Sequence, residues 1–504
     1  MKIFIFCLLS LCWSRVTSGQ EEFCLFEKCE CSGDVMQDEI LESNDQAVKI
    51  YDIYCRLEET NEMGGFPARD SSPEAQTGRV YIFDLQSNKI RSIPDEAFTG
   101  LDVQYLDMNL NEIRVIGNRS LSGLAGSVAL DMSYNQIELI EPDAFNHATF
   151  ELRALKIDSN KLGSMEPAQL SSVFRSLGTL SALQMANNGL SEMPRISHLG
   201  QLKQLSLSKN QIEHLGHIPS SVSDLNLDHN RLRSIEADTL ANLKELKYLS
   251  LDGNQIGHID PAAFHNLVEL VSINLARNYI KHLPDKFLFT LINLDRLDVS
   301  SQNQMLNNIS AFAFDRQSNE KFIKSIDLSG NRLSHFSGRA FCSRNQTRSY
   351  INVIELSLAN RLESEVSACW FVHVWRGYHS SIHGLDRRIP KVVFKKSTLF
   401  DNADVHTKCS CEFDKARLFV NLDGHCLMDD GQLVPFSSFS CQTNFDKKEV
   451  EAQCDSMPEY QCTPAHTTTT TTTTTVTTTT TFTTTTVTTT PAPTTTTAPV
   501  QFVH

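Results

Sequence analysis

The chain has 504 residues and a formal net charge of −15. Nucleic acids and anionic membranes both attract basic surfaces, so we expect this acidic chain to bind neither of them. Beyond the first nineteen residues, no apolar run approaches the ~18 residues that a transmembrane helix requires, and we expect no membrane insertion.

The two ends of the chain differ in composition from the part between them. Residues 1–19 contain a lysine, an apolar run and then small residues, which is the pattern of a cleaved secretory signal peptide. Residues 463–504 are mostly threonine with valine, proline and alanine, and such a segment has too little apolar surface to offset the entropy of ordering. The sequence therefore predicts a secreted, extracellular protein with a disordered, mucin-like tail.

Between these ends, the pattern LxxLxLxxNxL recurs eleven times over residues 80–333. Successive copies, of which LKQLSLSKNQI at 202–212 is a clear example, begin 20 to 29 residues apart, and a degenerate copy follows at 351–362. Internal repeats of this length stack into a solenoid. The central L-x-L pair places alternate side chains inward on a short strand, so we predict an α/β solenoid with one parallel sheet across 80–362.

Two further columns of the repeat have a structural interpretation. An asparagine after each strand can satisfy backbone groups that the bend leaves unpaired, and this column comprises Asn88, Asn111, Asn135, Asn160, Asn188, Asn210, Asn230, Asn254, Asn278 and Asn331. Gln302 occupies the column in the tenth copy, and its longer side chain is expected to distort its turn. Phenylalanines that follow several strands are expected to pack in the core of the convex side, namely Phe98, Phe145, Phe264 and Phe287.

The cysteines lie at the two ends of the repeat region. Twelve remain once the signal peptide is removed, and none lies between residues 56 and 341. In the oxidising secretory pathway an even number favours disulfides, with the pairing left open. The two clusters are Cys24, Cys29, Cys31 and Cys55, and then Cys342, Cys369, Cys409, Cys411, Cys426, Cys441, Cys454 and Cys462.

The repeats resemble the typical subfamily of extracellular leucine-rich repeat proteins. The resemblance implies a horseshoe with a concave parallel sheet and cysteine-capped ends. The N-terminal cluster, with its C-x-C at Cys29 and Cys31, resembles an N-terminal cap over 20–79. Residues 363–462, an irregular segment followed by Cys409-Ser-Cys411 and EFDKARLFV, resemble a C-terminal cap.

The non-consensus strand positions of such a repeat face the concave surface and are candidates for protein binding. Tyrosines beside exposed aliphatics match the composition of interface anchors. Three aspartates share one column, and neighbouring strands are ~4.8 Å apart, so the row suits a cationic partner. A solvated face explains the charges equally well. The candidates are Tyr81, Asp84, Tyr105, Asp107, Leu110, Asp131 and Tyr134, with Ile82 and Val128 beside them.

Signals for catalysis and metal binding are weak. The sequence has no nucleophile elbow, phosphate-binding glycine loop or HExxH helix, so we expect no enzymatic activity and no cofactor. The best metal candidate is the group His406, Cys409, Cys411, His425 and Cys426. Zinc sites use wider C-x-x-C spacings and the secretory pathway oxidises thiols, which favours disulfides over a metal.

Three N-glycosylation sequons, at Asn118, Asn308 and Asn345, are expected to lie away from the concave sheet. The features together favour a secreted protein-binding scaffold for recognition or adhesion in the extracellular matrix or at the cell surface. One alternative is a non-catalytic leucine-rich repeat subunit of a secreted enzyme complex, since the caps and repeats also resemble that subunit of arthropod luciferases. Another is a soluble receptor or decoy that recognises microbial patterns.

Overall fold

The computed structural model describes residues 29–32, 50–55, 78–146, 150–260, 262–303 and 306–317, and then parts of 323–457. All of these belong to one compact unit, Met1–Thr463. Several predictions fall outside the described residues and stay predictions: the signal peptide at 1–19, the tail at 463–504, the sequon at Asn345, and Cys24, Cys409, Cys462 and His406.

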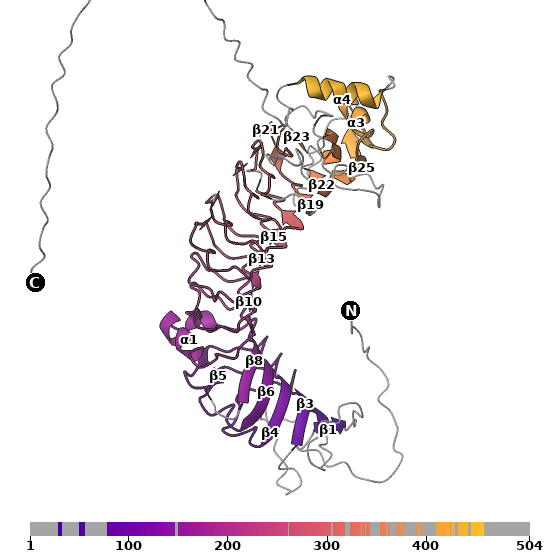
Figure 1. Ribbon diagram of the computed structural model, residues 1–504. Coiled ribbons are helices and arrows are strands. Elements are labelled where there is room, and N and C mark those ends of the chain that lie inside the picture. The colour runs from indigo at the N-terminus through magenta and orange to yellow at the C-terminus, as the bar shows by residue number, and fades with distance from the viewer. Residues whose placement is uncertain are drawn as a thin grey trace, which may run out of the picture. The chain divides into compact units, whose positions relative to one another are not determined.

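The main element is a 16-stranded sheet in which each repeat contributes one strand (Figure 1). All neighbouring strands pair in parallel except β1 and β2, which pair antiparallel. Figure 1 shows this ladder bending, with β10, β13 and β15 on the inside of the bend. In order, the strands are β1 (Cys29–Ser32), β2 (Ile50–Cys55), β3 (Gly78–Asp84), β4 (Leu101–Asp107), β6 (Leu124–Asp131), β8 (Phe150–Lys156), β9 (Ala182–Gln184), β10 (Gln204–Ser206), β11 (Asp224–Asn226), β13 (Tyr248–Ser250), β15 (Ser272–Asn274), β17 (Arg296–Asp298), β19 (Ile323–Asp327), β22 (Val353–Leu358), β24 (Lys391–Phe394) and β25 (Asn421–Asp423).

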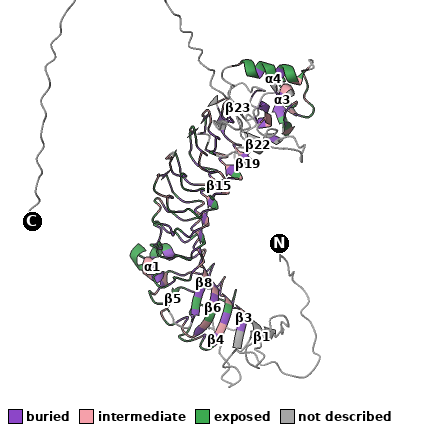
Figure 2. Ribbon diagram, in the orientation of Figure 1, coloured by how far each residue is buried: buried purple, intermediate pink, exposed green. Residues whose placement is uncertain are grey.

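Shorter elements complete the fold. Helix α1 (Pro167–Val173) follows the 3-10 turn η2 (Leu162–Ser164), and helices α3 (Cys411–Ala416) and α4 (Lys447–Ser456) lie in the C-terminal part. Figure 2 shows α4 as a largely exposed element. Small two- and three-stranded sheets join β5 (Val115–Ile116) to β7 (Leu139–Ile140), β12 (Ser234–Ile235) to β14 (His258–Ile259), β16 (His282–Leu283) to β18 (Asn308–Ile309) and β21 (His335–Phe336), β20 (Arg332–Leu333) to β23 (Arg361–Leu362), and β26 (His425–Leu427) to β27 (Leu433–Pro435).

The core runs without interruption along the repeats. The inward L-x-L residues are buried in every copy from the first to the eleventh, as Leu205 and Leu207 are in β10 and just after it. The four phenylalanines predicted to pack in the core are buried as well, and the rings of Phe264 and Phe287 meet edge to face with centroids 5.9 Å apart. Each repeat therefore buries its apolar face against its neighbours, as in a solenoid. With the parallel pairing of the strands, this confirms the predicted parallel solenoid.

The asparagine column forms a buried ladder of hydrogen bonds from repeat to repeat. Asn111 Nδ2 donates to the carbonyls of Leu85 and Met108 at 2.9 and 3.0 Å, and its Oδ1 accepts from the backbone N–H groups of Asn88 and Ile90. Each asparagine thus serves its own turn and that of the preceding repeat. The predicted role of this column, which is to satisfy backbone groups at the bend, is confirmed.

Gln302 takes part in the ladder with altered geometry. It is fully buried, its Oε1 accepts from Ile280 N at 3.0 Å, and its Nε2 donates to the carbonyls of Leu275 and Ser300. The neighbouring Asn303 takes a positive φ of 47°, a left-handed conformation that most of the other turns do not use after the ladder residue. The longer side chain therefore keeps the contacts to the preceding repeat while its own turn changes, as predicted.

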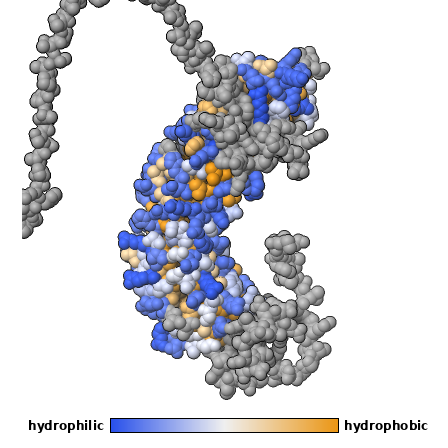
Figure 3. Space-filling model, in the orientation of Figure 1, coloured by the Kyte–Doolittle hydropathy of each residue, from blue (hydrophilic) through white to orange (hydrophobic). Residues whose placement is uncertain are grey.

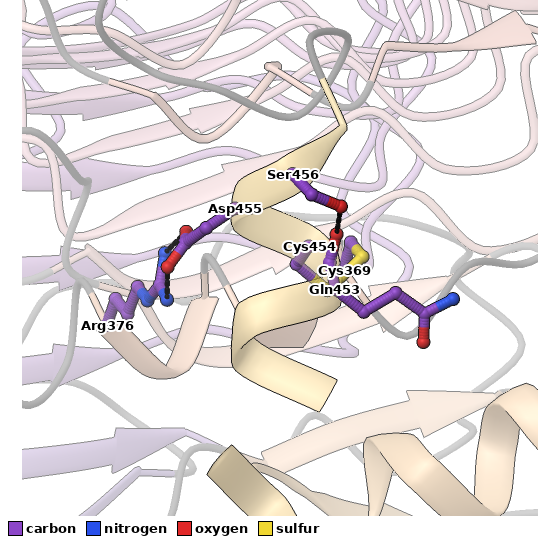
Figure 4. The surroundings of a disulfide bond; sticks show 6 residues. All are labelled: Cys369, Arg376, Gln453, Cys454, Asp455 and Ser456. Carbon is purple, nitrogen blue, oxygen red and sulfur yellow. Dashed lines mark hydrogen bonds and ion pairs between the residues drawn. A yellow bond between two sulfur atoms is a disulfide. The ribbon is translucent and has the colours of Figure 1, made fainter. Parts of the chain in front are cut away.

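Disulfides hold the C-terminal part together. Cys369 bonds to Cys454 of α4 (Figure 4). Cys411 bonds to Cys441, so both pairs join cysteines of the second cluster. Arg376 also donates two hydrogen bonds to Asp455, at 2.7 and 3.1 Å. Cys55, Cys342 and Cys426 are disulfide-bonded too. Because Cys411 and Cys426 are in disulfides, neither is available as a zinc thiolate.

Candidate functional site

The outward side chains of β3 to β19, together with those of the turns that directly follow these strands, form the surface that we call the sheet face. The register of the strands places Asp84, Asp107 and Asp131 directly beside one another, as successive Cα partners. Tyr105 lies between Ile82 and Ala129 in the same way, two residues earlier on each strand. The predicted row of three aspartates is therefore present at the N-terminal end of the sheet face.

The aspartates have a structural role in addition to their charge. Each accepts a hydrogen bond from the backbone N–H two residues later, as Asp107 Oδ1 does from Asn109 N at 3.0 Å. Asn226, Asn274, Asp298 and Asp327 make the same contact in later repeats. At these seven positions the side chain closes the turn, and either aspartate or asparagine can supply the acceptor.

Burial and like charge raise proton affinities in this row. Desolvation, partly opposed by the hydrogen bond from Asn109 N, raises the pKa of the Asp107 carboxyl, and the charges of Asp131 and Asp84 raise it further. The Tyr105 hydroxyl donates to Asp107 Oδ2 at 3.4 Å, and desolvation followed by the same carboxylates raises the pKa of Tyr105 far above its usual value. The half-buried Tyr105 hydroxyl therefore stays neutral beside these carboxylates.

Two candidates are less accessible than the sequence predicted. Asp131 is only 8% exposed, because Ser133 N and Lys156 Nζ, at 3.6 Å, approach its carboxylate. Val128 is fully buried. The prediction of an exposed Val128 is wrong because β6 has one residue fewer between Val128 and Leu130 than β8 has between Leu152 and Leu155. The register shift between Val128 and Ala129 therefore places Val128 opposite the core residue Leu152.

The most exposed large apolar groups at this end are Tyr81, Leu110 and Tyr134, with 47%, 52% and 60% of their surface accessible. Leu110 and Tyr134 occupy the position just before the ladder asparagine, where φ is 56° and 55°. Every other repeat places a serine, asparagine, lysine, histidine, arginine or glycine there, and these residues also adopt positive φ. Left-handed backbone at a bulky apolar residue is unusual, so these two side chains stand out in their column.

Sequence reasoning missed a second region of the sheet face. A hollow of about 490 Å³ lies over β9 to β15 and is lined by Tyr248 together with Gln204, Asn226, Ser272 and Asn274, among others. A neighbouring hollow lies over β15 to β19, lined by Arg296, Asp298 and Asp327 among others. Tyr248 occupies the same strand position as Tyr105, so reading that column beyond the third repeat would have found it.

Much of the surface visible in Figure 3 is hydrophilic, with apolar areas between the polar ones. The sequons at Asn118, which follows β5, and at Asn308, in β18, belong to elements outside the 16-stranded sheet. Their glycosylation stays a prediction. Among the described residues there is no cluster of histidine, cysteine, aspartate or glutamate suited to hold a metal ion.

Comparison with known proteins agrees with the fold. The leucine rich repeat family model matches residues 78–137 and 220–280. The chain has the leucine-rich repeat fold. It is 30% identical over 174 residues to Tsukushi of Gallus gallus, which is 33% of this chain and 46% of that protein. It is 27% identical to keratocan of Danio rerio, over 34% of this chain and 48% of the relative, and 30% identical to lumican of Bos taurus, over 36% and 51%.

The chain spans about half the length of these relatives, which are secreted, non-enzymatic proteins of the extracellular matrix. Among solved structures, the APL1 leucine-rich repeat domain is 18% identical, with a TM-score of 0.49 over 76% of this chain and 97% of that one. The TLR13–ssRNA13 complex is also 18% identical, with a TM-score of 0.46 over 72% and 56%. That nucleic acid is not a partner of this chain stays a prediction.

No helix among the described residues has both the length and the apolar character needed to cross a membrane.

Proposed function

We propose that the chain is a secreted, non-enzymatic scaffold that binds another extracellular protein through the N-terminal end of its sheet face. We call this region the tyrosine surface and define it as Tyr81, Tyr105, Leu110 and Tyr134 with Asp84 and Asp107. Relatives that are secreted matrix proteins support the location and the class of function. The geometry of the tyrosine surface supports its choice as the binding site.

One observation carries the proposal: two exposed apolar side chains stand where the backbone disfavours them. Leu110 and Tyr134 have positive φ, which costs a bulky residue ~1 kcal/mol relative to glycine or asparagine. Being more than half exposed, they gain little from burial within this chain. The chain therefore gives up stability to present them, as expected for groups that become buried against a partner.

The charges beside these groups favour a cationic partner. Asp84 and Asp107 lie in one row with no lysine or arginine opposite either of them in the adjacent strand. Desolvation and the like charges of Asp131 and Asp84 already raise the pKa of Asp107. A lysine or arginine of the partner would relieve this repulsion and would speed association at low salt.

The experiment compares the secreted chain with the double variant Leu110→Asn/Tyr134→Asn. Asparagine tolerates the left-handed conformation, so this variant removes both apolar groups while the fold keeps or gains stability. Each protein is immobilised and exposed to an extract of the native extracellular matrix, and the retained proteins are quantified by mass spectrometry. We expect at least one protein to be retained about tenfold less by the double variant.

Lys209→Asn is the matched control, because Lys209 has the same positive φ of 56° in a repeat outside the tyrosine surface. The control should retain the same proteins as the unaltered chain. Equal retention by all three proteins would contradict the proposed surface. A stoichiometric catalytic chain among the retained proteins would instead favour a subunit of an enzyme complex.

A further inference from the structure

The hollow over β9 to β15 differs chemically from the tyrosine surface. Of the side chains that line it, only that of Asp224 carries a charge, and its floor consists of buried leucines such as Leu225. The remaining lining groups are hydroxyls and carboxamides around one aromatic ring. Its volume of about 490 Å³ lies within the range of pockets that hold small ligands, ~300–1,000 Å³.

Two carboxamides in the hollow are held in fixed orientations. Asn226 Oδ1 accepts from Asp228 N, and Asn274 Oδ1 accepts from Ala276 N, both at 3.0 Å. Each turn therefore fixes the plane of its amide, and neither Nδ2 group donates to a described residue. The hollow thus presents two oriented donors, one on each side of β13.

Acceptors lie between and beside these donors. Ser250 Oγ donates to Asp228 Oδ1 at 2.6 Å, which leaves the oxygen lone pairs of Ser250 as acceptors. Asp224 accepts from Ser223 Oγ through Oδ2, so its Oδ1 is open to a further donor. Gln204, which faces Asp224 in the register, adds an exposed amide that both donates and accepts. Closely spaced donors and acceptors of this kind suit a ligand with many hydroxyls.

Tyr248 provides the apolar contact. Its side chain is 50% exposed and stands between its register partners Asp224 and Ser272. The negative face of an aromatic ring attracts the polarised C–H groups of a flat aliphatic ring. A single aromatic ring surrounded by neutral hydrogen-bonding groups is therefore suited to a sugar ring, which has an apolar C–H face and a hydroxylated rim.

We propose that this hollow binds a neutral oligosaccharide, with Tyr248 packing against one sugar ring and the amides of Asn226 and Asn274 donating to hydroxyls on either side. The chain's charge of −15, with Asp224 in the hollow and Asp298 beside it, disfavours sulfated or uronic-acid sugars. A pyranose unit is about as long as the ~4.8 Å between adjacent strands, so successive sugars can meet successive repeats. The site is separate from the tyrosine surface and does not depend on that proposal.

The test uses the full secreted chain and neutral oligosaccharides of defined length. Chito-, cello- and manno-oligosaccharides of two to five units are titrated by ligand-observed saturation-transfer NMR and by calorimetry, with a heparin-derived hexasaccharide and a neutral Ser/Gly/Asn peptide as competing occupants. We expect one neutral series to bind, with affinity rising with length and unchanged by added salt, because no ion pair contributes.

Two variants localise the binding. Tyr248→Ala should weaken it about tenfold through loss of the aromatic contact. Asn226→Asp should weaken it about three- to tenfold, because it removes the Nδ2 donor while keeping the acceptor that closes the turn. The fold is expected to tolerate this change, since Asp298 and Asp327 make that same turn contact in the native chain.

Asp84→Asn, a change in the same column outside the hollow, is the matched control and should bind as the unaltered chain does. The proposal is overturned if no neutral oligosaccharide binds at millimolar concentration. It is also overturned if only the heparin fragment or the peptide binds, or if Tyr248→Ala and Asn226→Asp bind as well as the control. Because Leu110→Asn/Tyr134→Asn should leave sugar binding intact, the failure of one proposal is distinguishable from that of the other.

Discussion

Removing one rung of the asparagine ladder tests how the repeats hold together. Asn254 is buried, its Nδ2 donates to the carbonyls of Leu227 and Leu251 at 2.9 and 3.0 Å, and its Oδ1 accepts from Leu232 N at 3.2 Å. In Asn254→Ala the Leu232 N–H loses its side-chain partner, whereas the carbonyls of Leu227 and Leu251 each lose one donor and keep another, from Asn230 and Asn278. A buried polar group left unpaired costs about 1–3 kcal/mol, and we expect a loss of about this size.

Asn254→Asp keeps the hydrogen-bond acceptor at this position and removes the hydrogen-bond donor. The carboxylate still accepts from Leu232 N, but its second oxygen faces the carbonyls of Leu227 and Leu251. Burial and these carbonyls are expected to raise the pKa of the new carboxyl in the folded state above its unfolded value. The folded state then binds the proton more tightly, so the stability of this variant should fall as pH rises through the folded pKa and recover in acid.

Urea denaturation followed by circular dichroism measures both variants at pH 7 and pH 4. Asn266→Ala is the control, because Asn266 is exposed and, among the described residues, its Nδ2 donates one hydrogen bond, to the carbonyl of Ala241 at 3.2 Å. We expect the control to lose less than about 0.5 kcal/mol. Two results would contradict the role of the ladder. One is a loss of unfolding free energy in Asn254→Ala no larger than that in the control. The other is a deficit of Asn254→Asp, relative to the unaltered chain, that is as large at pH 4 as at pH 7.

Three further predictions concern the core, the aspartate row and a disulfide. Leu207→Ala should lower the free energy of unfolding by about 2–5 kcal/mol through the buried cavity it leaves, and a loss below half a kcal/mol in urea would place Leu207 outside the core. Asp107→Asn should raise the free energy of unfolding at pH 7 by up to about 1 kcal/mol, since it removes like charge but keeps the acceptor for Asn109 N. Because the pKa of Asp107 is raised on folding, this gain should shrink in acid. A gain that does not change with pH would refute this cause. Replacing Cys369 and Cys454 by serine opens a link across 85 residues, worth about 4–5 kcal/mol, and limited proteolysis should then cleave the C-terminal part first while the repeats persist.

The sequence alone determined the repeat and its phase. Each repeat packs against its two neighbours only, so the positions of core leucines, ladder asparagines and strand-face columns follow from counting residues within one copy. For this reason the side-by-side placement of Asp84, Asp107 and Asp131 was predictable, as was the unusual turn at Gln302.

Exposure on the sheet face was decided by the tertiary structure. Asp131 and Val128 occupy columns that read as exposed, yet a one-residue register shift in β6 places Val128 in the core, and Lys156 of the next strand approaches the Asp131 carboxylate. The Asn226 amide acquires its fixed orientation only when its turn closes. The sequence assigns each side chain to a column, but its accessibility depends on the lengths and side chains of the adjacent repeats, which become neighbours only when the solenoid is stacked.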